Sequence, residues 1–277
     1  MNDTKIVKDS VENRKRISLR AKMRIALIAL KENGLIWFCQ LAIYYIASTV
    51  ENAAYESMDR RRRRKGIPGL NSLALNKAIW ESWDWTAGGE EWTSSDAWKA
   101  SVVRCVLQRY LPERVRVLEI GPGAGRWTTE LIGRSSTYTG VDISASCIDL
   151  CKTKFSGHAQ ATFRVGSGSD LRDIPDRSID ALWSFDVFVH INETEVDAYA
   201  NEFKRVMAPA ATGVVHHGGV GGAAGGWRSN VTRTSMLDLL RKRGFEIVDS
   251  FSEWQDQGTV QNVSVYKDSF TVFRLPG

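Results

Sequence analysis

From residue 115 to residue 274 the chain alternates short apolar runs with longer polar and apolar segments, and this alternation restricts its fold more than any other feature. The runs have the length and composition of strands, and they cover residues 115–120, 138–143, 162–165, 179–185, 213–217, 245–251 and 269–274. Helical segments are expected between them, at 126–132, 144–155, 193–207 and 234–243. Because parallel strands need a crossover that is usually a helix, the alternation predicts an α/β fold, a seven-stranded parallel sheet with helices on both faces.

Two further segments precede the predicted sheet. Residues 1–65 are expected to form a basic and apolar helical extension, which is followed by the linker Gly66-Ile-Pro-Gly. Residues 66–114 are rich in tryptophan and are expected to form a lid and then a helix that Pro112 ends. Residues 115–277 hold the predicted sheet and are expected to form the third part.

The extension holds the excess positive charge of the chain. Of the 37 Lys and Arg residues 15 lie in residues 1–65, with only 7 of the 32 acidic residues, and the remainder is slightly acidic. That balance argues against nucleic acid as the partner of residues 66–277. Residues 34–50 carry no charge but are short for a membrane span. Residues 17–65 are therefore expected either to pack as a helical pair, on the domain or across a homodimer, or to lie on a membrane surface.

The four cysteines indicate a reducing compartment. Their spacing has no paired pattern of the kind that zinc sites use, and Cys147 and Cys151 would lie one helical turn apart. Reduced thiols are typical of cytoplasmic proteins. We therefore expect a cytoplasmic protein, placed at the inner face of the membrane if the extension touches a bilayer.

The first apolar run leads into a turn with glycine at every second position: Gly121, Gly123 and Gly125. Glycine lets the backbone bend sharply and approach a ligand closely. The spacing G-x-G-x-G lacks the third glycine position of the dinucleotide fingerprint, and a glycine pattern alone is weak evidence. Glu119 can orient this turn and attract a cationic group. Asp142, which ends the second run, can accept bonds from both hydroxyls of a ribose or can cap a helix.

This combination resembles the class I S-adenosylmethionine-dependent methyltransferases over roughly residues 95–277. The resemblance implies a Rossmann-like sheet and S-adenosylmethionine as the cofactor. In that family the loop after the third strand holds adenine. Here that loop is 166–171, with Ser167 where the family often has an acidic residue, so Asp170 or backbone amides would hold the base, unless Asp170 is simply solvated. The residues expected to bind the cofactor are Glu119, Gly121, Pro122, Gly123, Gly125, Arg126, Asp142, Ile143, Gly168, Ser169, Asp170, Ser184 and Phe185.

Three of the four histidines, His190, His216 and His217, fall at strand ends that face the predicted cleft. Histidine titrates near neutrality and is the usual base for a hydroxyl nucleophile. We rank His190 first as general base, with His216 and His217 binding or supporting the substrate and Asp186 orienting a histidine or the substrate. The alternative is a structural role. The histidines could also ligate a metal, but we expect none because the acidic cluster of metal-dependent methyltransferases is missing.

Aromatic and charged residues flank the expected entrance to the site. The glycine-rich stretch 218–226 is expected to form a lid, or else a flexible loop. Tryptophan faces pack well on the C–H faces of sugars, although several of these rings are also expected in the core. The candidates for binding substrate are Trp85, Glu91, Trp92, Trp227 and Arg228.

Several motifs together resemble bacterial sugar O-methyltransferases that act on polysaccharides, of the methylmannose polysaccharide and O-antigen type. These motifs are Trp80-x-x-Trp83-Asp-Trp85, Gly89-Glu-Glu-Trp92-Thr, the glycine turn through Trp127, Ser184-Phe-Asp-Val-Phe-Val-His190 and His216-His217. The resemblance implies a carbohydrate hydroxyl as acceptor. The chain departs from the group at Pro209-Ala-Ala-Thr, where relatives commonly have Pro-Gly-Gly, and at His217-Gly-Gly. The alternatives are a small-molecule O- or N-methyltransferase of natural-product metabolism and a non-catalytic binding protein with this fold.

Overall fold

The computed structural model describes residues 19–67, 69–221, 228–263 and 267–277. The chain divides into two units, Met1–Gly69 and Leu70–Gly277. The boundary between the two units lies close to the end of the predicted extension. The tryptophan-rich segment, however, belongs to the same unit as the sheet, whereas the sequence predicts it as a separate part.

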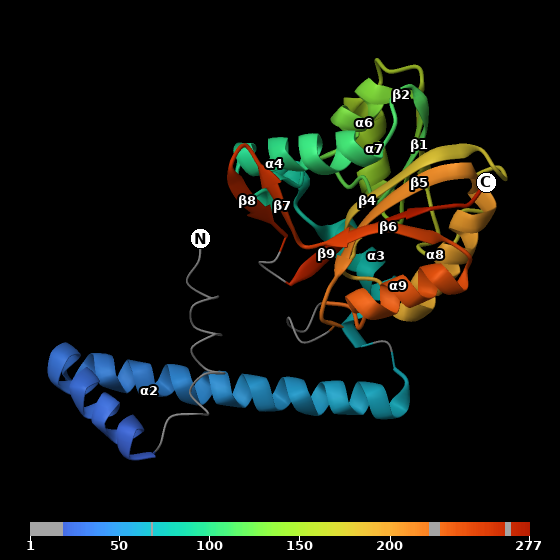
Figure 1. Cartoon of the computed structure of the whole chain (residues 1–277). Coiled ribbons are helices and arrows are strands. Elements are labelled where there is room, and N and C mark those ends of the chain that lie inside the picture. The colour runs from blue at the N-terminus through green and yellow to red at the C-terminus, as the bar shows by residue number, and fades with distance from the viewer. Residues whose placement is uncertain (1–18, 68, 222–227, 264–266) are drawn as a thin grey trace. The chain divides into compact units, whose positions relative to one another are not determined.

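In the described part of the first unit the main element is helix α2, Leu19–Lys65, which bends at Gly34, where φ is 79° and ψ is 170° (Figure 1). Large apolar side chains on both sides of the bend are exposed, including Leu27, Ile36 and Ile43. The last turn of α2 is wholly basic, from Arg62 to Lys65. Among the described residues one helix, Met23–Lys65, is long and apolar enough to cross a membrane, an indication that rests on length and composition alone.

The second unit is built on a sheet in the order β3-β2-β1-β4-β5-β9-β6 (Figure 1). The strands from β3 to β5 run parallel, and β9 is antiparallel to both of its neighbours. The bounds are β1 Val115–Ile120, β2 Ser135–Asp142, β3 Ala161–Val165, β4 Ile179–Phe188, β5 Met207–Gly218, β6 Glu246–Phe251 and β9 Asp268–Arg274. Seven strands and the Rossmann-like order are confirmed.

The prediction of a wholly parallel sheet is wrong at β9. The segment between β6 and β9 holds no helix among its described residues but a hairpin, β7 Glu253–Asp256 with β8 Thr259–Asn262. Without a crossover helix the chain returns in the opposite direction, so β9 inserts antiparallel between β5 and β6.

Helices cover both faces of the sheet, as predicted. Neighbouring strand residues point to opposite faces, so Leu118 and Leu182 join one apolar core, and Val117 and Trp183 join the other. Helices α8 and α9 contribute to the first core, and α4, α6 and α7 to the second. Among the described residues of this unit the α-helices are α3 Leu73–Ser82, α4 Asp96–Val102, α5 Gln108–Tyr110, α6 Thr128–Arg134, α7 Ala145–Lys154, α8 Glu193–Val206 and α9 Arg233–Lys242.

Candidate functional site

The predicted glycine turn joins β1 to α6 in a conformation that only glycine adopts without strain. Gly121, Gly123 and Gly125 all have positive φ, at 71°, 55° and 84°. A Cβ on Gly121 would lie 2.1 Å from Cγ2 of Val187, and one on Gly125 would lie 2.6 Å from the Phe155 ring. The turn therefore depends on glycine for both backbone angles and space.

Asp142 ties the end of β2 to this turn. Its Oδ2 accepts the Gly123 N–H at 3.1 Å and its Oδ1 accepts the Ser144 N–H at 2.9 Å. Burial raises the pKa of Asp142 to about 6, although these amides act in the opposite direction. The carboxylate thus lies against the glycine turn. The N-cap of α7 is Ser144, whose hydroxyl accepts the Cys147 N–H, so Asp142 is not the helix cap, and its contact with a ribose stays a prediction.

Glu119 supports the turn from beneath. It is 2% exposed, and its Oε2 accepts hydroxyl bonds from Thr128 at 2.7 Å and Tyr138 at 2.5 Å. Burial raises the pKa of Glu119 to about 7. The carboxyl group therefore connects β1, α6 and β2, which fits the predicted role in orienting the loop.

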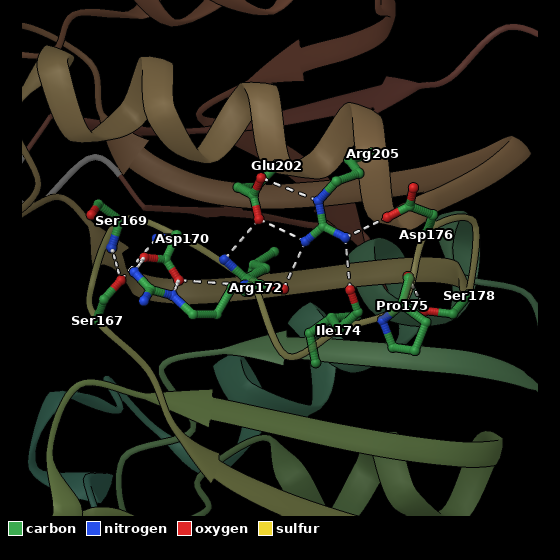
Figure 2. A network of polar contacts seen from close by, with 11 residues as sticks. Ser167, Ser169, Asp170, Arg172, Ile174, Pro175, Asp176, Ser178, Glu202 and Arg205 are labelled. Atoms are coloured by element: carbon green, nitrogen blue, oxygen red, sulfur yellow. Dashed lines mark hydrogen bonds and ion pairs between the residues drawn. The ribbon is translucent and has the colours of Figure 1, made fainter.

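The loop after β3 borders a cavity of about 250 Å³ next to the end of β2. Gly168 fits closely against Ile143, because a Cβ on Gly168 would lie 2.6 Å from the Ile143 side chain. Asp170 is paired with Arg172 at 2.6 Å, which lowers the pKa of Asp170 to about 2, and the Ser169 N–H bonds to Ser167 (Figure 2). The described residues that line the cavity are Val141, Arg164, Val165, Gly166, Ser167, Asp170, Leu171, Arg172, Asp173 and Ile174.

Arg205 on α8 fastens this loop, and the sequence analysis did not identify it. Its guanidinium donates to the carbonyls of Leu171 and Ile174, both at 2.8 Å, and pairs with Asp176 and Glu202 (Figure 2). Glu202 in turn accepts the Leu171 N–H at 2.9 Å. Arg205 and Glu202 of α8 therefore hold in place the loop that lines the cavity.

Three residues predicted to bind cofactor are engaged within the protein. Ser184 donates its hydroxyl to the Ile120 carbonyl at 2.9 Å, which joins β4 to β1. Phe185 stacks on His216, with ring centroids 4.3 Å apart. Arg126 is 7% exposed and bonds to Thr93 Oγ1, the Trp92 carbonyl and Asp186. These contacts give each residue a structural role within the domain, and its contact with a cofactor stays a prediction.

Asp186 lies where β4 leaves the sheet, with a left-handed φ of 59° that is rare outside glycine. One oxygen is 2.7 Å from Arg126 Nη1 and the other is 3.1 Å from His216 Nδ1. Burial raises the pKa of Asp186, but His216 and Arg126 outweigh this effect and hold it below the usual range. The side chain is 31% exposed, so the carboxylate is both fixed and accessible.

The other two histidines have different surroundings. His217 is completely buried, and its ring nitrogens contact the Gly218 carbonyl and Thr271 Oγ1, both at 2.8 Å. Burial lowers the pKa of His217 to about 3, so we leave it out of the proposed site. His190 is half-buried after β4, with its ring 5.4 Å from that of Trp80 and its carbonyl bonded to Asn71 and Asn76.

The tryptophan-rich segment forms one aromatic cluster. Trp80 packs against Trp83, Trp85 and Trp92 with ring centroids 5.7 to 6.0 Å apart, and all four rings are half-buried. Trp85 also lies over the glycine turn, since a Cβ on Gly123 would be 3.2 Å from its ring. The cluster therefore adjoins both the turn and His190.

The remaining predicted substrate residues are scattered. Glu91 is exposed and accepts the indole N–H of Trp83 at 2.9 Å. Arg228 pairs at 3.1 Å with Asp268, a buried residue that the sequence analysis missed because it starts a strand with no distinguishing motif. Trp227 and most of the predicted glycine lid lie outside the described residues. Within the described part of the chain, no three His, Cys, Asp or Glu side chains are grouped to hold a metal ion.

Comparison with known proteins agrees with this geometry. Residues 117–210 match the family model described as a methyltransferase domain. The glycine turn, Asp142, Asp186 and His190 all lie in this matched segment, which covers about a third of the chain.

Solved structures agree on the fold. A chain in the complex between the Haloferax volcanii Trm112 methyltransferase activator and its methyltransferase has a TM-score of 0.57 and 16% identity, covering 73% of this chain and 97% of its own length. A SAM-dependent methyltransferase of Methanosarcina mazei has a TM-score of 0.50 and 19% identity, covering 62% and 97%. The fold is that of a methyltransferase.

Curated relatives match only in part. An uncharacterised methyltransferase of Oceanobacillus iheyensis is 27% identical over 47% of this chain and 56% of its own length. A demethylmenaquinone methyltransferase of Tropheryma whipplei is 29% identical over 36% of this chain and 40% of its own length. The chain thus spans about half the length of these relatives.

Proposed function

We propose that the chain is an S-adenosylmethionine-dependent methyltransferase that methylates a hydroxyl group of a sugar or glycan, with a histidine taking the proton. The observation that carries the proposal is the bond between Asp142 and the Gly123 amide. It joins a ribose-binding carboxylate to a glycine turn at the ends of β1 and β2, inside the segment that matches the methyltransferase family.

The residues of this edge fit the cofactor. Asp142 has a lone pair on each oxygen beyond its amide bonds, so it can accept from ribose hydroxyls. The glycine turn can approach the amino-acid part, and the cavity beside Val141 and Leu171 can take the flat base. When bound, the cofactor supplies a methyl group on a positively charged sulfur. Methyl transfer is then an in-line displacement that needs an aligned nucleophile and, for a hydroxyl, a proton acceptor.

The tryptophan cluster favours a carbohydrate acceptor. Four half-buried indole rings adjoin the glycine turn and His190, and such rings present wide apolar faces next to polar groups. His190 and His216 are the two histidines that remain candidates for the proton acceptor. A smaller acceptor is the second candidate, since the Tropheryma whipplei relative is named as a demethylmenaquinone methyltransferase. A non-catalytic protein is the remote alternative.

The test begins with calorimetric binding of S-adenosylmethionine and its demethylated product to the full chain. Absence of binding would leave only the non-catalytic alternative. Radiolabelled cofactor is then offered with manno-oligosaccharides, with a panel of phenols and amines, and with a demethylated quinone. We expect label in the oligosaccharides, and label confined to the other acceptors would reject the carbohydrate proposal but keep the methyltransferase.

A cytoplasmic location and contact of residues 17–65 with a membrane surface complete the proposal. Exposed apolar side chains on α2 precede the basic turn Arg62 to Lys65, and anionic lipids attract such residues. Co-sedimentation with phosphatidylglycerol vesicles should pellet the full chain, and replacing Arg62 to Lys65 by serine should reduce the pelleted fraction. Equal pelleting with neutral phosphatidylcholine vesicles would reject the electrostatic part. A homodimer through α2 instead would give twice the chain mass in light scattering without lipid.

A further inference from the structure

Five ionisable side chains form a row across the ends of the strands. Arg126 contacts Asp186 at 2.7 Å, Asp186 contacts His216 Nδ1 at 3.1 Å, His216 Nε2 lies 3.7 Å from Asp268, and Asp268 contacts Arg228 at 3.1 Å. His216 lies in the middle and its side chain is 3% exposed. Its ring is held between Phe185 and Phe270, with centroids 4.3 and 5.3 Å away. The ring is therefore fixed with one carboxylate at each nitrogen.

The hydrogen bonds of His216 show which contact of this row has no proton between its two atoms. The Asp186 backbone N–H donates to Nδ1 at 3.2 Å, so Nδ1 presents a lone pair. Oδ1 of Asp186 lies 3.1 Å from that nitrogen and also presents only lone pairs while the carboxylate is ionised. Two acceptors therefore face each other at hydrogen-bond distance, and one added proton would turn this contact into a charge-assisted bond.

The second nitrogen completes the arrangement. With Nδ1 unprotonated, neutral His216 carries its proton on Nε2, which has no hydrogen-bond partner among the described residues and faces Asp268 at 3.7 Å. An imidazolium here would lie between two carboxylates, with Arg126 and Arg228 on their far sides. Burial raises the pKa of Asp268 to about 6, against the opposing effects of His216 and Arg228, which agrees with a position that gains from a nearby cation.

We infer that Asp186 and His216 together form the proton-accepting pair of the methyl transfer, with Asp186 facing the acceptor hydroxyl and Asp268 a positioning residue behind His216. The inference rests on the proposed function and narrows it to acceptors with a transferable O–H or N–H proton. Asp186 is the accessible member, at 31% exposure, and His216 lies directly behind it.

The step balances as follows in atoms and electrons. The acceptor O–H bond breaks, its electron pair stays on the oxygen that bonds to the methyl carbon, and the C–S pair leaves with the sulfur. The released proton passes through the Asp186 carboxylate to Nδ1 of His216. The Asp186 amide loses its bond to Nδ1, and Oδ1 gains the stronger charged one.

The first test needs no acceptor, so it is independent of the proposed function. The full chain is labelled with ¹⁵N-histidine, and the His216 signals are assigned by their loss in His216→Gln. We expect the free protein at pH 8 to show a protonated Nε2 and a bare Nδ1. A proton on Nδ1 at pH 8 would overturn the inference, because the hydrogen bond from Nδ1 to Oδ1 of Asp186 would already be formed in the free protein.

The second test measures methyl transfer to manno-oligosaccharides. His216→Gln should lower kcat about 100-fold or more, the usual contribution of a general base, while cofactor affinity changes less than about twofold. Exposed His158→Gln is the matched control and should keep the wild-type rate. A His216→Gln protein that binds cofactor and keeps its rate, while His190→Gln loses it, would assign the proton to His190.

A third variant separates positioning from folding. Asp268→Asn keeps the side-chain shape and removes one charge beside His216, so the acid limb of the pH–rate profile should move to lower pH. An unchanged profile would remove Asp268 from the mechanism. Wild-type protein that neither binds cofactor nor transfers methyl would defeat the proposed function instead, and the tautomer measurement would still decide the proton position.

Discussion

The stability of the glycine turn can be predicted quantitatively, because both the backbone conformation of Gly121 and the space around it require glycine. Its φ of 71° is left-handed, and a Cβ would lie 2.1 Å from Cγ2 of Val187 and 3.3 Å from its Cβ. Valine is branched at Cβ and cannot swing one methyl away without moving the other. We therefore expect Gly121→Ala to destabilise the second unit strongly.

The magnitude follows from the two contributions. A non-glycine residue in the left-handed region costs about 1–2 kcal/mol. An extra methyl forced into a packed site costs about 1–3 kcal/mol. The sum is about 2–5 kcal/mol, and at about 2–4 °C per kcal/mol for a unit of this size the Tm should fall by about 4–20 °C.

The assay is calorimetric unfolding of four proteins: wild type, Gly121→Ala, Val187→Ala and the double variant. Removing the valine methyls should restore the steric part, about 1–3 kcal/mol, and leave the backbone part. Gly133→Ala in α6 is the matched control, since its Cβ would meet nothing within 4 Å and alanine favours a helix. A Tm of Gly121→Ala within about 1 °C of the wild type, or no positive coupling with Val187→Ala, would refute the described packing.

Three further predictions concern the buried charges. Glu119→Gln should raise the Tm at pH 8 but hardly at pH 4.5. Burial raises the folded-state pKa of Glu119 from 4.5 to about 7, so the stability of the wild type falls as the pH rises through that window. Equal Tm shifts at both pH values would contradict this. Cofactor affinity should weaken as the pH falls through about 6, where Asp142 takes up a proton. Asp142→Asn should weaken binding at pH 7.5 and remove the change in affinity around pH 6. Calorimetry at pH 5, 6 and 7.5 measures both effects. Arg205→Met should lower cofactor affinity about tenfold, because it releases the carbonyls of Leu171 and Ile174 in the loop after β3 and each bond is worth about 0.5–1.5 kcal/mol. The control Arg241→Met, at an exposed position, should leave affinity unchanged. Equal affinities in the two variants would mean that this loop holds no part of the cofactor.

The sheet could be predicted from local patterns because each parallel strand is a short buried run with its own helix. Strand β1 begins and ends at the predicted residues, and α8 differs from its prediction by one residue. The antiparallel β9 could not be predicted in the same way, since a buried run has the same composition in either direction. The hairpin β7–β8 carried a signal that was overlooked: two short polar-apolar strands separated by Gln257 and Gly258, both with positive φ.

The local structure of the candidate site was predictable where the backbone determines it. The glycine turn and Asp142 follow from spacing, because a parallel sheet brings the ends of adjacent strands to one edge. Arg126 shows the limit of such reasoning. Its place after the turn suggests a ligand contact, yet its guanidinium bonds to Thr93, Trp92 and Asp186. Partner choice among long side chains depends on segments that meet only after folding, and no periodicity encodes it.

Three carboxyl groups at this edge of the sheet show why residue type alone does not give a role. Glu119 and Asp142 are buried with neutral donors, so burial dominates and their pKa values rise to about 7 and 6. Asp186 is held by Arg126 and His216, and its pKa falls. Near neutral pH the first two can gain or lose a proton as the local charge changes, whereas Asp186 stays ionised. A positively charged ligand over the glycine turn would favour the ionised forms of Glu119 and Asp142, and only Asp186 is suited to remain a constant acceptor during a reaction. The difference comes from what each carboxylate touches, so the chemistry of this edge is decided by packing.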